Sequence, residues 1–283
     1  MRSPATTRRA VVVAVVSAGA GCLTGQSPGT PTGSQTTGEP TTSPTPPTPS
    51  ETPADDRTRA VGDAYETAEG WTVTVENVAV RHGVRKFGTV HVDPVWADGA
   101  QFVVADVVVD GDGPDVTDLD VAVEVDTLDR SGRIYVHSER NADETRQRFG
   151  YAVPTDPAPE RAALVWRPNA GPTVRWALDS AAVRALGAAP EFSVESFTAP
   201  ETATGSELET TLTVRNAGER DGRFLAEVGD AAMSDQPEFA LDVPAGETAT
   251  GRPTVSAHFD DDEVTVVLRW ENGTKERRVR RSK

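Results

Sequence analysis

Apolar and polar residues alternate over long stretches of the chain after residue 70, and this two-residue period predicts β-strands. From Trp71 to Val75 the alternation is regular, and its phase shifts at Glu76-Asn77, which predicts a β-bulge. Residues 101–110 are apolar on both faces at their centre, as in a central strand covered on both sides. Further strands are predicted at 121–125, 134–136, 149–153, 162–166 and 174–178, with a short helix at 180–186.

A second set of strands follows the boundary that we place at Ala188-Ala189-Pro190. Asn272-Gly273 predicts the tight turn of a closing hairpin. The predicted strands are 191–197, 208–215, 224–228, 239–243, 249–255, 263–270 and 275–280. Short strands with frequent turns favour an all-β fold, which we expect to be two tandem immunoglobulin-like β-sandwiches at 62–188 and 189–283, after a disordered N-terminal stalk.

The first 22 residues predict an export signal. Arg8 and Arg9 precede an apolar run at 11–16, which is too short to span a bilayer. The arginine pair resembles a twin-arginine signal, although Ala10 and Val11 follow where a large apolar residue is usual. The alternative is an ordinary export signal with two arginines.

Cys22 is the single cysteine of the chain and ends a run of small residues. Gly19-Ala20-Gly21-Cys22 resembles a lipobox, with Gly19 where Leu or Val is usual. The resemblance implies cleavage before Cys22 and lipidation of its thiol. The alternative is a free thiol inside a discarded signal. A stable anchor needs two lipid chains on this residue, because one acyl chain binds membranes only marginally.

Residues 23–61 predict a disordered tether. Between Thr24 and Ala54 there are ten Thr, eight Pro, four Ser and four Gly, and no Val, Ile, Leu, Met or aromatic residue. Such a segment cannot bury enough apolar surface to offset its loss of conformational entropy on ordering. In an extended polyproline conformation it could reach on the order of 100 Å.

The charge of the chain limits its partners. The formal net charge is −16, and this argues against binding to nucleic acid or directly to an anionic membrane surface. Three of the 28 basic residues are lysines, and an acidic, lysine-poor surface is typical of halophilic proteins. A single cysteine leaves no intrachain disulfide. Asn272-Gly273-Thr274 is an N-glycosylation sequon, so Asn272 is a candidate glycosylation site.

Two resemblances rest on strand pattern. Gly99 to Val109, with the strand from Trp71 and the segment Leu128 to Tyr135, resembles the immunoglobulin-like DUF4352 module of secreted lipoproteins, for which no catalytic residues are defined. Leu212 to Gly218 and Val243 to Thr248 resemble CARDB-like surface domains. The resemblances imply a haloarchaeal-type secreted lipoprotein whose domains are spacers or binding platforms.

Candidate chemistry is sparse. Asp110 to Asp115 fails as an EF-hand, because positions five and twelve hold Pro114 and Val121. His258 with Asp260 to Glu263 is better interpreted as a hydrated acidic loop. His82 and His91 share one insert and are the weak candidates for a metal site. A blue-copper centre lacks its cysteine ligand, and no catalytic motif stands out, so we expect no catalytic residue and no cofactor.

Five tryptophans could form a carbohydrate-binding face, but large aromatics at alternating positions are usually core. Trp96 is expected to be the most exposed of them.

The sequence thus predicts a non-catalytic, lipid-anchored protein on the outer face of the cytoplasmic membrane, presenting two sandwiches for binding. The expected partners are membrane lipid through the anchor and a cell-surface protein or glycan. A purely structural spacer is the first alternative. A metal-binding or enzymatic domain that uses the His82/His91 insert is the second.

Overall fold

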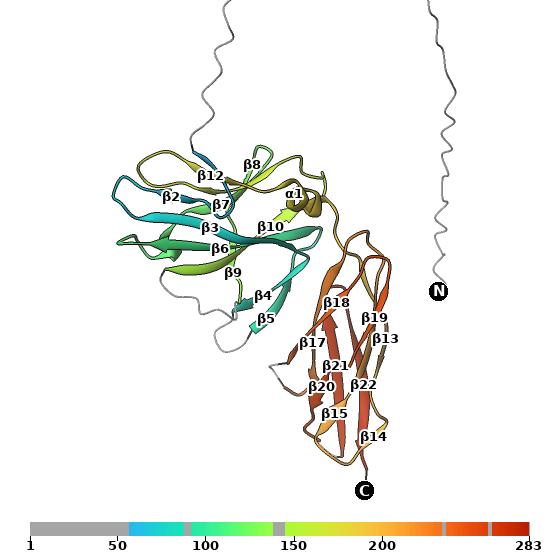
Figure 1. Cartoon of the computed structure of the whole chain (residues 1–283). Helices are drawn as coiled ribbons and strands as arrows, with labels where there is room; N and C mark the ends of the chain where they lie inside the picture. The colour runs from blue at the N-terminus through green and yellow to red at the C-terminus, as the bar shows by residue number, and fades with distance from the viewer. Residues whose placement is uncertain (1–56, 88–91, 138–144, 234–235, 260–261, 283) are drawn as a thin grey trace, which may run out of the picture. The chain divides into compact units, whose positions relative to one another are not determined.

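The structure is a computed structural model that describes residues 57–87, 92–137, 145–233, 236–259 and 262–282. Arg8, Arg9, Cys22 and His91 lie outside the described residues. The described residues belong to one compact unit, Thr52–Lys283, which contains two β-sandwiches (Figure 1). The all-β prediction is confirmed, since one α-helix and one 3₁₀ helix accompany 22 strands among the described residues.

The first sandwich consists of two five-stranded sheets with the orders β2-β3-β6-β10-β9 and β1-β12-β11-β7-β8, and of a separate hairpin, β4-β5. Its elements are β1 (Thr58–Ala60), β2 (Ala64–Glu66), β3 (Thr72–Arg81), β4 (Gly83–Phe87), β5 (Val92–Trp96), β6 (Ala100–Asp110), η1 (Val116–Asp118), β7 (Val121–Val125), β8 (Leu128–Arg130), β9 (Arg133–Tyr135), β10 (Arg146–Pro154), β11 (Ala162–Trp166), β12 (Val174–Ala177) and α1 (Ser180–Gly187).

The second sandwich has a three-stranded sheet, β13-β16-β19, and a five-stranded sheet, β14-β22-β21-β17-β18, with the short pair β15-β20 beside them. Its elements are β13 (Phe192–Thr198), β14 (Thr202–Ala203), β15 (Glu207–Glu209), β16 (Thr211–Asn216), β17 (Gly222–Asp230), β18 (Glu238–Val243), β19 (Thr248–Gly251), β20 (Thr254–Ser256), β21 (Glu263–Trp270) and β22 (Gly273–Arg281).

Both sandwiches have the same strand order. Six core strands run along each chain segment, β3-β6-β7-β10-β11-β12 and β13-β16-β17-β19-β21-β22, and the first, second and fourth pair in one sheet while the third, fifth and sixth pair in the other. A short strand also pairs parallel with the last strand, β1 with β12 and β14 with β22. Strands A, B and E facing C, F and G is the immunoglobulin arrangement, so the predicted fold class is confirmed from topology.

The pattern around Trp71 predicted the local backbone correctly. The pairing of β3 with β6 shifts register between Glu76 and Ala79, and Asn77 adopts φ 52° there. Asparagine tolerates this left-handed conformation better than most residues. β6 is buried at nine consecutive positions, 101–109, because it is a central strand with covered faces.

Each sandwich encloses its own apolar core. Trp176, Tyr151 and Phe149 are the largest fully buried side chains of the first, and Phe197 and Phe224 those of the second. The phenol of Tyr151 on β10 donates a hydrogen bond of 2.9 Å to the carbonyl of Val121 on β7, and so joins the two sheets of the first sandwich. Burial raises the pKa of this phenol far above its ordinary value, because the low-dielectric core disfavours the phenolate.

Some elements differ from the predictions. The insert after Arg81 forms the hairpin β4-β5, which the sequence analysis did not predict as strands. The predicted strand 249–255 is divided into β19 and β20. The two-residue turn before β22 is Glu271-Asn272 rather than Asn272-Gly273, because Gly273 already pairs with Trp270. β1 lies inside the range 23–61 that we expected to be tether.

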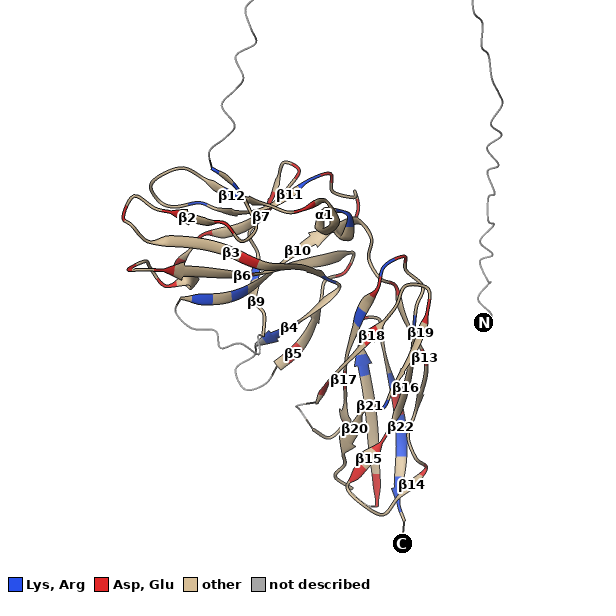
Figure 2. Ribbon diagram, in the orientation of Figure 1, with Lys and Arg blue, Asp and Glu red and all other residues tan. Residues whose placement is uncertain are grey.

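Charged residues lie both in the turns and within strands of the two sandwiches (Figure 2). The basic C-terminal segment is the strand β22, in which Lys275 donates to the carbonyl of Val194 over 2.8 Å and Arg277 to that of Phe197 over 2.8 Å. These contacts tie the five-stranded sheet to β13 of the other sheet. Among the described residues no helix is both long and apolar enough to cross a bilayer.

Candidate functional site

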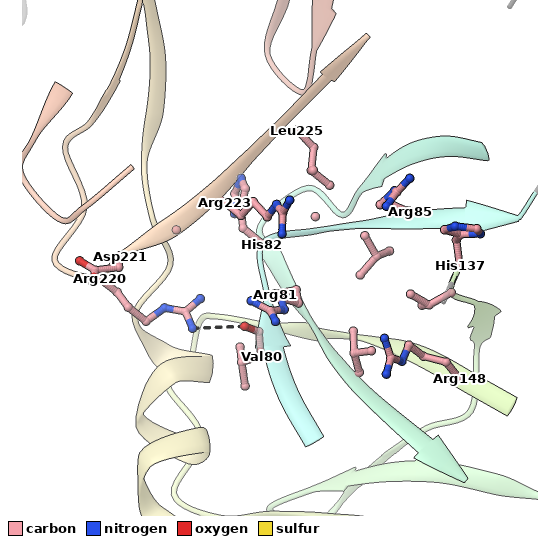
Figure 3. Close-up of a pocket in the computed structure, with 15 residues that line it drawn as sticks. Val80, Arg81, His82, Arg85, His137, Arg148, Arg220, Asp221, Arg223 and Leu225 are labelled. Atoms are coloured by element: carbon pink, nitrogen blue, oxygen red, sulfur yellow. Dashed lines mark hydrogen bonds between the residues drawn. The ribbon is translucent and has the colours of Figure 1, made fainter. Parts of the chain in front are cut away.

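A cavity of about 430 Å³ lies between the end of β3, the hairpin strand β4, strands β6 and β10, and the start of β17 (Figure 3). Residues of both sandwiches line it. Its titratable and charged lining residues are Arg81, His82, Arg85, His137, Arg148, Arg220, Asp221 and Arg223. The volume falls in the range of small-molecule sites.

The local sequence explains how the chain forms the wall of the cavity that contains His82 and Arg85, here called the upper wall. β3 ends at Arg81, and Gly83 begins β4, so His82 and Arg85 enter the cavity wall from a sharp strand-to-strand connection. A Cβ atom at Gly83 would lie 3.0 Å from Cδ1 of Trp96 and 3.3 Å from Cδ1 of Leu225. Glycine at this position therefore allows β5 and β17 to approach β4 closely.

Arg148 is held by a buried carboxylate on the neighbouring strand. Asp106, which is 2% exposed, accepts hydrogen bonds of 2.6 and 2.9 Å from Nε and Nη2 of Arg148. The amide of Asn77 donates a third, of 2.9 Å. Burial alone disfavours the carboxylate anion, but the hydrogen bonds and the charges of Arg148 and Arg146 outweigh it and hold the pKa of Asp106 below its ordinary value. Asp106 is thus charged, and it neutralises Arg148.

Two further contacts join the sandwiches at the cavity. Nε2 of His82 lies 2.6 Å from Oε2 of Glu271, in the turn before β22, and Nε of Arg85 donates to Oε2 of Glu238 over 2.6 Å. The ring of His82 also packs edge-on against Phe192, with ring centroids 5.4 Å apart. The upper wall is therefore fixed to β18, β13 and the β21–β22 turn.

Arg220 differs from Arg85 and Arg148 of the cavity because the described residues provide only uncharged acceptors for it. Its guanidinium donates to the side-chain oxygen of Gln101 and, over 3.4 Å, to the carbonyl of Val80 (Figure 3). Gln101 is fully buried, and its amide nitrogen donates to the carbonyls of Ala185 and Leu186 at 2.6 and 2.9 Å, so its oxygen faces Arg220. Burial, and then the charge of Arg81, lowers the pKa of Arg220 from its ordinary value.

The predicted metal candidates do not form a site in the described chain. His82 is paired with Glu271, and His91 lies outside the described residues. No group of three or more His, Cys, Asp or Glu residues with suitable geometry for a metal occurs among the residues that the structure describes. His258 lies with its Nδ1 3.7 Å from Oδ2 of Asp230, and Asp260 and Asp261 are outside the described ranges.

The acidic turn and the sequon have simple structural environments. Asp115 accepts hydrogen bonds of 2.8 and 2.7 Å from the backbone amide and the hydroxyl of Thr117, and so begins the 3₁₀ helix η1. These bonds lower the pKa of its carboxyl. Asn272 is exposed in the turn between β21 and β22, where a glycan can be accommodated.

The tryptophans do not form a flat exposed face. Trp166 and Trp176 are core residues, and Trp96 is half-buried, as are Trp71 and Trp270, so none of the five tryptophans is fully exposed. Trp96 is covered because β5 packs on β17. Trp71 and Trp166 pack on each other, with ring centroids 5.4 Å apart, beside a second hollow of about 350 Å³.

The sequence pattern does not single out the arginines of the cavity. Arg81, Arg148 and Arg220 are separated by more than sixty residues from one another, and the strand pairings bring them together. One local signal was present: residues 81–86 hold Arg81, Arg85 and Lys86 without an acidic residue, in a chain with a formal charge of −16.

Comparisons with known proteins assign this chain to no family. No protein-family model matches it, and no curated protein matches it. Among solved structures, a beta-glucosidase from Listeria innocua in complex with isofagomine is 14% identical over 33% of this chain and 16% of its own, with a TM-score of 0.25. The chain therefore spans less than a fifth of that enzyme.

Two tandem-domain structures match over more of the chain. A chimeric titin Z1Z2 is 14% identical over 64% of this chain and 89% of its own, with a TM-score of 0.20. DIP-gamma IG1+IG2 is 12% identical over 64% of this chain and 88% of its own, with a TM-score of 0.19. At such TM-scores these likenesses carry no argument, and the fold assignment above rests on strand order.

Proposed function

We propose that this chain is a non-catalytic, lipid-anchored protein of the outer face of the cytoplasmic membrane, and that its two β-sandwiches bind a ligand in the cavity described above. The resemblances of the sequence to a lipobox, to DUF4352 and to CARDB-like domains are part of this proposal. The observation that carries it is a concave site in which polar residues of both sandwiches converge.

The convergence of polar residues on one cavity favours a binding protein over a structural spacer. A spacer needs only sandwiches with satisfied surfaces, whereas here five arginines and two histidines from both sandwiches surround one cavity. The arginine and histidine side chains are half-buried or exposed, so they remain accessible to a ligand that enters the cavity. The contacts of His82 and Arg85 with the second sandwich also pre-organise the wall, which lowers the entropic cost of binding.

Binding can be tested without knowing the ligand. The full chain, purified in detergent, is dialysed to equilibrium against the low-molecular-weight fraction of the spent growth medium, and both compartments are analysed by mass spectrometry. We expect enrichment of one or a few small molecules with the protein, relative to a dialysis of albumin at equal concentration. No enrichment would favour the spacer.

The anchor has its own test. Cys22→Ser removes the thiol that a lipid would modify, so the variant should move from the membrane fraction, and from the detergent phase of a Triton X-114 partition, to the aqueous phase. Ser27→Ala, in the tether, is the matched control and should partition like the wild type. A Cys22→Ser protein that remains in the detergent phase would show that the anchor is not at this residue.

A further inference from the structure

The cavity is strongly cationic in a strongly acidic protein. Five of its lining residues are arginines and one is an acid, Asp221, whereas the whole chain carries a formal charge of −16. The carboxylate of Asp221 accepts a 2.9 Å hydrogen bond from the backbone amide of Ala245. The lining therefore concentrates positive charge where the rest of the molecule is negative.

Three of the arginines lie within 4 Å of a carboxylate. Arg85 pairs with Glu238 at 2.6 Å, and Arg148 pairs with Asp106 at 2.6 and 2.9 Å. Arg223 lies 3.8 Å from Oδ1 of Asp242. These three form the wall and add little net charge to the cavity.

Arg81 and Arg220 are not neutralised in this way. Among the described residues neither has a carboxylate within 4 Å, and Arg220 is half-buried with an Nε atom that has no hydrogen-bond partner there. The charge of Arg81 lies near enough to Arg220 to lower its pKa. Both residues line the same cavity (Figure 3), and two guanidinium groups that share a cavity without an anion repel each other.

Apolar side chains complete the lining. Val84, Val104, Val136 and Leu225 are buried at the cavity, and Val80 is half-buried. They pack mostly on one another and on their neighbours, and the hydrocarbon part of an organic ligand could cover the small apolar surface that the lining still presents to the cavity, which an inorganic ion could not.

We infer that the cavity binds the oxyanion group of a small organic ligand, a carboxylate or a phosphate ester, between Arg81 and Arg220. This inference rests on the proposed binding function and names the ligand class. A guanidinium presents its donors in a planar fork that matches two oxygens of a carboxylate or phosphate. The anion supplies the charge that Arg81 and Arg220 lack, and its apolar part contacts the valines and Leu225.

Calorimetric titration of the full chain in 1 M KCl tests this with four probes: phenyl phosphate, benzoate, inorganic phosphate and the neutral benzamide. We expect phenyl phosphate to bind most tightly because it carries two charges, followed by benzoate. Both should bind at least about tenfold more tightly than benzamide, which corresponds to one charge-assisted contact. Tighter binding of benzoate than of phenyl phosphate would identify the oxyanion as a carboxylate and would still support the inference.

Arg81→Gln is the decisive variant, because Arg81 is exposed and its replacement breaks no ion pair with a described residue. We expect this variant to bind phenyl phosphate with about tenfold lower affinity than the wild type. Arg252→Gln changes the same residue type at an exposed position outside the cavity and should leave affinity unchanged. Arg220→Lys keeps the positive charge but loses the planar set of guanidinium donors, so it should bind phenyl phosphate more weakly. The thermal midpoint of unfolding reports whether this variant folds.

Three results would overturn the inference: equal binding of benzamide and benzoate, an unchanged affinity of Arg81→Gln for phenyl phosphate, or no binding of any anionic probe. Inorganic phosphate binding as tightly as phenyl phosphate would overturn the role given to the apolar lining. If no anionic probe binds in the titration but the dialysis experiment still enriches a small molecule, only the assignment of the ligand as an oxyanion is wrong. If both fail, the proposed binding function fails as well.

Discussion

Asp106 shows how one residue can support both the fold and the cavity wall. It lies on the central strand β6, is 2% exposed, and accepts hydrogen bonds from Arg148 and Asn77. A buried carboxylate without such partners would raise its pKa and become neutral, whereas here the pKa is lowered. The anion holds the β3 bulge on one side and the guanidinium of the cavity on the other.

Replacement of Asp106 by Asn should therefore destabilise the protein by about 3 kcal/mol at pH 7, because it leaves Arg148 without its buried partner. A folded-state pKa below the unfolded value of about 3.9 means that this stabilisation is complete above pH 5 and is lost as the pH falls through the folded pKa. Urea denaturation at pH 7 and at pH 3 measures both effects.

The difference between wild type and Asp106→Asn should shrink at the lower pH. Glu276→Gln, which removes a carboxylate at a mostly solvent-facing position of β22, is a suitable control and should change the free energy of unfolding by less than about 0.5 kcal/mol. If the difference in free energy of unfolding between wild type and Asp106→Asn is the same at pH 7 and pH 3, the charge of the carboxylate does not stabilise the folded protein.

At the scale of the element, the bulge in β3 sets the direction of the strand end that carries Arg81. Asn77 has φ 52° there, in the left-handed region, and its amide contacts Asp106. β-Branched residues adopt this conformation with difficulty, and glycine adopts it freely.

Asn77→Val and Asn77→Gly form a matched pair, because both remove the amide and only valine must also adopt the strained φ. We expect valine to cost about 1–2 kcal/mol more than glycine in the free energy of unfolding, measured by denaturant titration. Equal stabilities of the two variants would indicate that the bulge relaxes when the amide is lost.

The bulge, the buried strand β6 and most core strands could be predicted because alternation reports directly on burial. The hairpin β4-β5 could not, since Asp93 and Pro94 interrupt its apolar pattern and its partner surface, Leu225 on β17, comes from the other sandwich. The cavity could not be predicted either. Its key pair, Arg81 and Arg220, is separated by 138 intervening residues, and the acidic background of the chain does not indicate which arginines lack a carboxylate.

At the scale of the whole molecule, the cavity depends on contacts between the two sandwiches. The ion pair of Arg85 with Glu238 joins β4 of the first sandwich to β18 of the second, with side chains that are 39% and 11% exposed. If this contact persists in solution, the two sandwiches should be energetically coupled through it.

A double-mutant cycle with Arg85→Gln and Glu238→Gln measures that coupling. We expect an interaction energy of up to about 1 kcal/mol, as for partly exposed ion pairs. The pair of Arg278 with Glu263, 3.7 Å apart and more exposed, is the comparison within one sandwich and should give a smaller value. Zero coupling for Arg85 and Glu238 would mean that this ion pair does not couple the stabilities of the two sandwiches.

Charge acts on the molecule as a whole through its formal value of −16. Negative charges spread over the surface repel one another in the compact state and are farther apart in the unfolded chain, so the folded protein should gain stability from screening. The Debye length falls from about 10 Å at 0.1 M salt to about 3 Å at 1 M, and most of this change occurs at the low concentrations. The free energy of unfolding should therefore rise steeply with KCl up to roughly 0.5 M and level off beyond it. Exclusion of salt from the surface would instead give a steady rise that sorbitol reproduces, and that outcome would assign the stabilisation to solvent rather than to the charge of the protein.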